Sequence, residues 1–97
     1  MSDTSKIDPQ TRISRNEDHV SSEIDGETVL MSIEKGKYYG MNDIGSRIWK
    51  LLAEPITFQD LHDTLVKEFE GDSEQIRIDT LHFLEGLKKE DLVRYNP

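Results

Sequence analysis

The stretch TVLMSIEKGKYYGMN, residues 28–42, decides the fold of this 97-residue chain. In residues 28–33, large apolar side chains recur at every second position, which is the period of a β-strand. These side chains belong to Val29, Met31 and Ile33. Residues 34–36 end in glycine and predict a tight turn, and residues 37–41 predict a second strand. The stretch therefore predicts an antiparallel hairpin.

A further strand precedes the hairpin. Residues 19–24 carry two apolar side chains on one side, with polar residues between them. The dipeptide Asp25-Gly26 follows, and this pair readily adopts the positive φ angles of a two-residue hairpin turn. Residues 19–41 therefore predict an antiparallel three-stranded meander.

Three helices are predicted after the meander, because the hydrophobic period changes there from two to 3.6 residues. Asn42, Thr57 and Asp72 each precede a helical pattern and carry the side-chain oxygen that an N-cap needs. The apolar stripes are Ile44, Ile48, Leu51 and Leu52, then Phe58, Leu61, Leu65 and Phe69, then Ile76, Thr80, Phe83, Leu84 and Leu87. Gly45 is unfavourable in a helix and indicates close packing of the first helix on the sheet. Residues 92–95 predict a short final strand.

This order of elements predicts an α+β fold, a winged-helix-turn-helix-like domain in which a three-stranded antiparallel sheet is followed by three helices. We expect residues 19–97 to form this domain, since 97 residues offer room for a single core. Residues 1–18 show neither hydrophobic period and are expected to be a flexible N-terminal tail. Ile13 leaves open one additional strand within that tail.

Composition narrows the classes of partner. A net charge of -8 disfavours binding to phosphate backbones and to anionic membrane surfaces. The chain has no cysteine, which excludes disulfides and thiolate chemistry. Its apolar runs are too short for a membrane span and its first residues do not resemble a signal peptide, so a cytoplasmic protein is expected.

The sequence offers no pattern typical of a catalytic, cofactor or metal site. It has no nucleophile elbow, phosphate-binding loop or dinucleotide fingerprint. Asp60, His62 and Asp63 lie close together, but carboxylates in the first turn of a helix are explained by its dipole. His82 and Glu85 have helical spacing but lack a second pair of ligands. We therefore predict a protein that is not an enzyme and has no cofactor and no metal.

The predicted third strand lies at an edge of its sheet. Proteins usually protect a bare edge with charge, proline or a bulge, and Lys37 is the only such residue here. One interpretation is that the terminal helix covers this edge, with Tyr38 and Tyr39 in the core. The other is that a peptide adds a strand to it, backbone to backbone.

Several motifs together resemble the PqqD-like family. They are Asp25-Gly26, Val29-Leu30-Met31, residues 36–42, Gly45, residues 48–52, residues 83–87 and Leu92-Val93. The most specific is the Gly-x-Tyr-Tyr-x-Met-Asn segment of residues 36–42, followed three residues later by Gly45. The resemblance covers residues 19–94. The family often has leucine in place of Met41, and glycine before the final leucine, where this chain has Glu90-Asp91.

The resemblance implies a winged-helix protein that binds the leader segment of a ribosomally synthesised precursor peptide and presents it to a modifying enzyme. The family includes the pyrroloquinoline-quinone biosynthesis protein D and the stand-alone recognition proteins of lasso-peptide biosynthesis. The implied partners are the precursor peptide and a modifying enzyme, such as a radical-SAM enzyme or a leader peptidase. Neither a nucleic acid nor a membrane is expected as a partner.

In the family the leader lies as an added strand on the third strand, in a groove shared with the third helix. Carried over to this chain, the expected peptide-binding residues are Lys37, Tyr38, Tyr39, Gly40 and Met41 of the strand, and Ile76, Asp79, Thr80 and Phe83 of the helix. Asp79 would anchor a cation or an amide of the leader, or else it is an ordinary solvated helix acid.

Two other functions share this fold. A winged-helix DNA-binding regulator would need several basic residues on its recognition helix. The predicted second helix offers Lys67 against Asp60, Asp63 and Glu68, which argues against DNA. A structural protein–protein adaptor would differ only in what occupies the strand edge.

Overall fold

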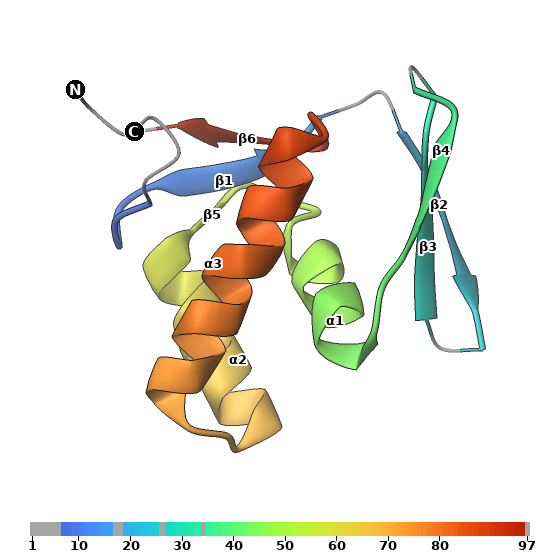
Figure 1. Ribbon diagram of the computed structural model, residues 1–97. Helices are drawn as coiled ribbons and strands as arrows, with labels where there is room; N and C mark the ends of the chain where they lie inside the picture. Colours follow the sequence, from blue (N-terminus) through green and yellow to red (C-terminus); the bar gives the residue numbers. More distant parts are fainter. Residues whose placement is uncertain (1–6, 17–18, 26, 34, 97) are drawn as a thin grey trace.

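The computed structural model describes residues 7–16, 19–25, 27–33 and 35–96. Three helices pack between two small antiparallel sheets (Figure 1). The elements in chain order are β1 (Arg12–Arg15), β2 (His19–Ile24), β3 (Glu27–Ser32), β4 (Lys37–Gly40), α1 (Asp43–Leu51), β5 (Ile56–Thr57), α2 (Phe58–Phe69), α3 (Ser73–Lys89) and β6 (Val93–Asn96). The expected α+β class, with a three-stranded antiparallel sheet followed by three helices, is confirmed.

The first sheet is the predicted meander, in the order β2-β3-β4. Asp25 has a φ of 54° in the turn between β2 and β3, as that hairpin turn requires. The core side of β3 carries Thr28, Leu30 and Ser32. The opposite face carries Val29 and Met31, and it is the more exposed one. The alternation of apolar residues therefore predicted the position of this strand correctly. Its more apolar face, however, points away from the helices.

The second sheet has the order β5-β1-β6, and its central strand comes from the segment expected to be a flexible tail. Ile13 is fully buried between its neighbours. The guanidinium of Arg15 lies 4.3 Å from the centroid of the Trp49 ring and donates to the Trp49 carbonyl oxygen. The structure thus corrects the tail expectation for Arg12–Arg15, while residues 1–6 and 17–18 lie outside the described residues.

The three predicted helix starts are confirmed. Asn42 Oδ1 accepts from the Gly45 N–H at 2.9 Å. Thr57 Oγ1 and Asp72 Oδ2 accept from the N–H groups three residues further on, at 3.2 and 2.9 Å. Each cap satisfies a backbone donor that the first turn of a helix leaves without an intrahelical partner.

Gly45 is needed for a different contact from the expected one. A Cβ at this position would lie 2.9 Å from Cε1 of Phe83 and 3.2 Å from Asn42 Oδ1. The glycine therefore admits the aromatic ring of α3 against α1, and the expectation that it packs on the sheet is wrong. As a result, the Phe83 ring lies close against the first turn of α1.

Within the described residues, no helix has the length and apolar character needed to cross a membrane.

Candidate functional site

Strand β4 has one edge without a strand partner in the described part of the chain, because it pairs only with β3. The N–H of Met41 donates to the Thr28 carbonyl at 3.0 Å, and Leu30 lies opposite Tyr39. Hydrogen-bonded and non-bonded pairs alternate along an antiparallel ladder, so the backbone groups of Tyr39 also face β3. Those of Tyr38 and Gly40 point to the open edge.

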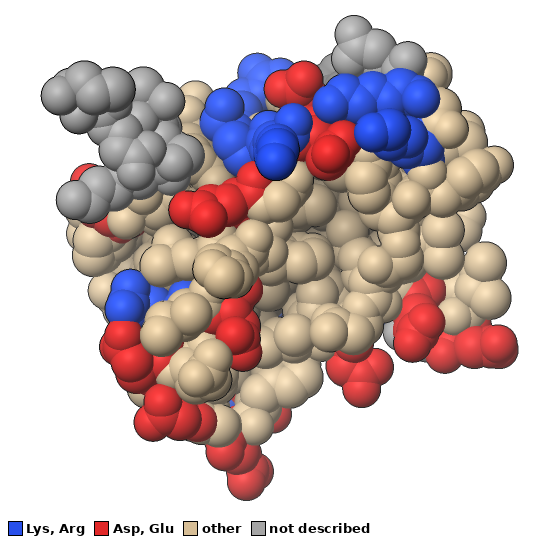
Figure 2. All heavy atoms as spheres, viewed as in Figure 1, with Lys and Arg blue, Asp and Glu red and all other residues tan. Residues whose placement is uncertain are grey.

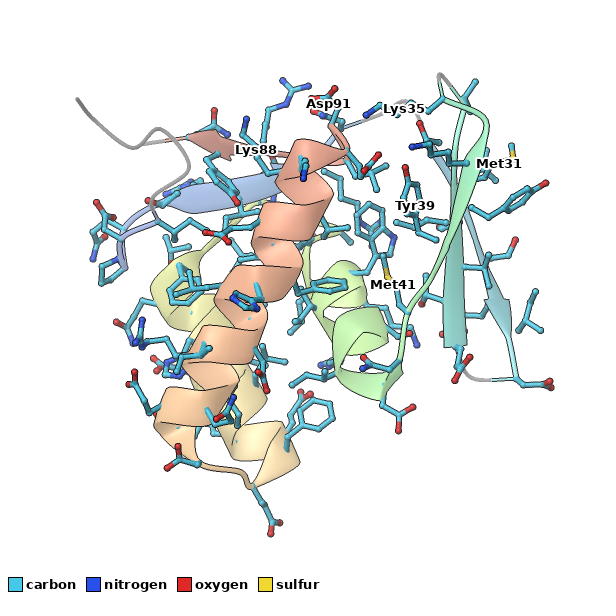
Figure 3. All side chains as sticks on the ribbon, in the orientation of Figure 1. Met31, Lys35, Tyr39, Met41, Lys88 and Asp91 are labelled. Carbon is cyan, nitrogen blue, oxygen red and sulfur yellow. The ribbon has the colours of Figure 1, made fainter. Side chains whose placement is uncertain are left out.

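A groove of about 390 Å³ runs between this strand and α3. Its lining residues are Tyr39 and Gly40 of β4, Met41 directly after that strand, His82, Phe83, Gly86 and Leu87 of α3, and Glu90 and Leu92 after the helix. Met41, Leu87 and Leu92 are buried and form an apolar base. Figure 3 shows Tyr39 and Met41 on the side of β4 that faces α3, with Met31 on the opposite side.

A hydrogen bond closes one end of the groove. Tyr39 Oη donates to Glu90 Oε1 at 2.8 Å, and Lys35 Nζ lies 3.4 Å from the same oxygen. The bond from Tyr39, followed by that from Lys35, holds the pKa of Glu90 below its ordinary value. Desolvation and the bond to Glu90 raise the pKa of Tyr39. This contact links β4 to the C-terminal end of α3.

The groove is nearly uncharged within a strongly polarised surface. Figure 2 shows Lys and Arg gathered at the top of the view and Asp and Glu predominant towards the bottom, with an uncharged surface between them. Among the described residues that line the groove, Glu90 is the only Asp, Glu, Lys or Arg, and its carboxylate is already paired with Lys35. Apolar contact and backbone hydrogen bonds are therefore what this site offers a ligand.

The structure brings four of the nine expected site residues together in the groove: Tyr39, Gly40, Met41 and Phe83. Lys37 and Tyr38 lie on the same strand, and the Tyr38 side chain is 74% exposed. The interpretation that both tyrosines are core residues is therefore wrong for Tyr38.

The other three expected residues lie away from the groove. Ile76 and Thr80 are buried in the core. Asp79 is exposed and accepts a hydrogen bond from Gln75 Nε2 at 2.9 Å, one turn earlier in α3. In this arrangement Asp79 is a helix-surface acid with a local partner.

Five lining residues were not expected from the sequence: His82, Gly86, Leu87, Glu90 and Leu92. Phe83 indicated which shoulder of α3 faces the groove, and stepping three, four or seven residues from it leads to Gly86, Leu87 and Glu90. That signal was present in the helical spacing. Leu92 lies beyond the helix, so no helical period reaches it.

The described residues contain no cluster of three or more His, Cys, Asp or Glu side chains with the geometry to hold a metal ion.

Comparison with known proteins agrees with this arrangement. The profile of the family described as "Coenzyme PQQ synthesis protein D (PqqD)" matches residues 27–93, which is more than half of the chain. No curated protein matches the chain.

Two solved structures share the fold. TbiB1 in complex with the TbiA(beta) leader peptide is 32% identical over 84% of this chain and 94% of that one, with a TM-score of 0.77. A lasso peptide synthetase B1 complexed with the leader peptide is 20% identical over 84% of this chain and 96% of that one, with a TM-score of 0.74, and shows the fold alone. The family match spans β3, β4, the three helices and the start of β6, and it includes every residue that lines the groove. The chain therefore belongs to the PqqD family.

Proposed function

We propose that this protein binds the leader segment of a ribosomally synthesised precursor peptide as an additional strand on β4 and presents it to a modifying enzyme. The observation that carries the proposal is the open edge of β4 beside an apolar groove. The 32% identity to TbiB1, whose structure is a complex with a leader peptide, supports it.

The geometry gives each part of an added strand a different role. Residues that pair with Tyr38 and Gly40 exchange backbone hydrogen bonds with them, and these bonds depend little on the sequence of the peptide. Residues opposite Tyr39 and Met41 point to the same face as those side chains, because directly opposite residues share a face. The side chains of these peptide residues enter the groove and therefore determine the specificity for the peptide.

Binding can be tested with the TbiA(beta) leader peptide, titrated by calorimetry and by amide chemical shifts. A scrambled peptide of the same composition is the control. We expect saturable binding of the leader, little binding of the scrambled peptide, and the largest shifts in residues 37–41 and 82–92. Shifts concentrated in α2, or equal binding of both peptides, would contradict strand addition at β4.

Presentation to an enzyme is the second half of the proposal. The resemblance to the family suggests a radical-SAM enzyme or a leader peptidase as the partner. A leader bound at β4 leaves the remainder of the precursor outside the groove and therefore accessible to such an enzyme. Faster processing of a full precursor in the presence of this protein, abolished by removal of the leader, is the expected result.

A further inference from the structure

The α3 wall of the groove contains a glycine that the fold itself does not require. Gly86 lies within the 17-residue helix α3, where glycine is less favourable than alanine. Its φ is not in the left-handed region that favours glycine, and a Cβ built on it meets no atom within 4 Å. Neither backbone geometry nor internal packing accounts for it.

Gly45 shows what a packing glycine looks like in the same protein. A Cβ at Gly45 would lie 2.9 Å from the Phe83 ring, so the contact between α1 and α3 demands glycine there. Gly86 borders open space instead, and that space belongs to the groove. Internal packing therefore explains the glycine at position 45 but not the glycine at position 86.

We propose that Gly86 is a specificity-determining residue whose missing side chain leaves the recess that receives one apolar side chain of the bound leader. This inference rests on the proposed function, since the register of β4 directs the peptide residue opposite Tyr39 into the groove. Phe83 and Leu87 flank Gly86 in α3, and the buried Met41 lies across from them. The recess therefore takes an apolar side chain rather than a charged one.

Substitution of Gly86 separates stability from binding. Gly86→Ala and Gly86→Leu both replace glycine by strong helix formers, and nothing in the protein obstructs the first methyl group. We expect the melting temperature to rise by roughly 3–6 °C in Gly86→Ala. Affinity for the TbiA(beta) leader peptide should fall roughly tenfold in Gly86→Ala and further in Gly86→Leu, because the added atoms occupy the recess.

Glu85→Ala is the matched control, since Glu85 is the preceding, exposed residue of α3 and does not line the groove. It should leave affinity within about twofold of that of the wild-type chain, as expected for a surface change away from the site.

Each alternative outcome has a distinct meaning. Undiminished affinity in Gly86→Leu, with the wild-type chain binding, overturns the role of Gly86 and leaves strand addition intact. A lower melting temperature in Gly86→Ala overturns it too, because the fold would then require the glycine. Failure of the wild-type chain to bind the leader contradicts the proposed function and removes the basis of the inference.

Discussion

Glu90 and Tyr39 join the two walls of the groove at one end, through the 2.8 Å hydrogen bond between Tyr39 Oη and Glu90 Oε1. The same carboxylate oxygen accepts from the tyrosine hydroxyl and from the Lys35 ammonium, and both bonds are stronger when the carboxylate is ionised.

The lowered pKa of Glu90 predicts a contribution to stability that disappears in acid. A carboxylate whose pKa is lower in the folded than in the unfolded chain stabilises the fold above its ordinary pKa of 4.5, and this contribution is lost as the pH falls through the folded value. We expect Glu90→Gln to lower the melting temperature at neutral pH and to flatten its decrease below about pH 4.5. Thermal unfolding across pH measures this, with Glu85→Gln as the control. Equal acid sensitivity of wild type and Glu90→Gln would contradict the assignment.

Gly45 gives the second prediction at this scale. Gly45→Ala forces the Phe83 ring or the Asn42 cap to move, since the new Cβ would lie 2.9 Å from Phe83 Cε1. We expect the free energy of unfolding to fall by about 1–3 kcal/mol, as is typical of overpacking, despite the better helix propensity of alanine. Urea denaturation measures it. The opposite sign is expected for Gly86→Ala, and a stabilised Gly45→Ala would mean that the ring of Phe83 adapts without cost.

Among the elements, β4 has a free edge and a definite register, and its sequence predicted only the free edge. The pattern of residues 37–41 was sufficient to predict a strand and a free edge. Which backbone groups face that edge follows only from the register, because a shift of one residue would exchange Tyr38 and Tyr39. At the two ends of β4, the Gly36 N–H donates to the Ser32 carbonyl at 2.8 Å and the Met41 N–H to the Thr28 carbonyl at 3.0 Å, which fits this register.

Proline substitutions test this register. Tyr38→Pro removes an N–H that faces the open edge, a place where proline is tolerated in sheets, so the fold should persist while leader affinity falls roughly tenfold or more. Tyr39→Pro removes an N–H directed at β3 and should disrupt the sheet itself. Tyr38→Ala, which keeps the N–H, is the control for loss of the exposed side chain. Affinity for the TbiA(beta) leader and circular dichroism together distinguish these cases. If Tyr38→Pro bound as well as Tyr38→Ala, the assigned edge would be wrong.

Strand β1 is the element that local sequence patterns did not predict. Residues 12–15 contain one large apolar residue, Ile13, which is too little to display a period of two. Its neighbours are β5 and β6, which lie much further along the chain. A strand defined by distant partners leaves no local signal. The helices, by contrast, carry their caps and apolar stripes within a few residues and were predicted closely.

At the scale of the whole molecule, the site depends on how separate elements meet. The sequence identified the strand wall and one helix residue, Phe83, whereas Glu90 and Leu92 join the groove because the chain turns back after α3 towards β6. Ile76 and Thr80 were expected in the site because they lie on the same side of α3 as Phe83, but both are buried in the core. A helical wheel does not show how far along the helix the neighbouring strand extends. The site is therefore determined by how β4, α3 and the segment after α3 are placed around one groove.

The charge distribution of the whole molecule disfavours DNA binding, the other function considered for this winged-helix architecture. Helix α2 carries one lysine among several acids, and Glu68 is engaged by Arg47 at 2.7 Å. With a net charge of -8, close approach of duplex DNA is opposed by repulsion, and few phosphates would be neutralised. We expect no binding of a labelled random-sequence duplex at about 150 mM salt with up to ~10 μM protein, measured by fluorescence anisotropy. The TbiA(beta) leader peptide, for which binding is proposed above, is labelled in the same way and measured alongside. Binding of the duplex with a steep salt dependence, or competition between duplex and leader, would contradict this and would favour the regulator interpretation.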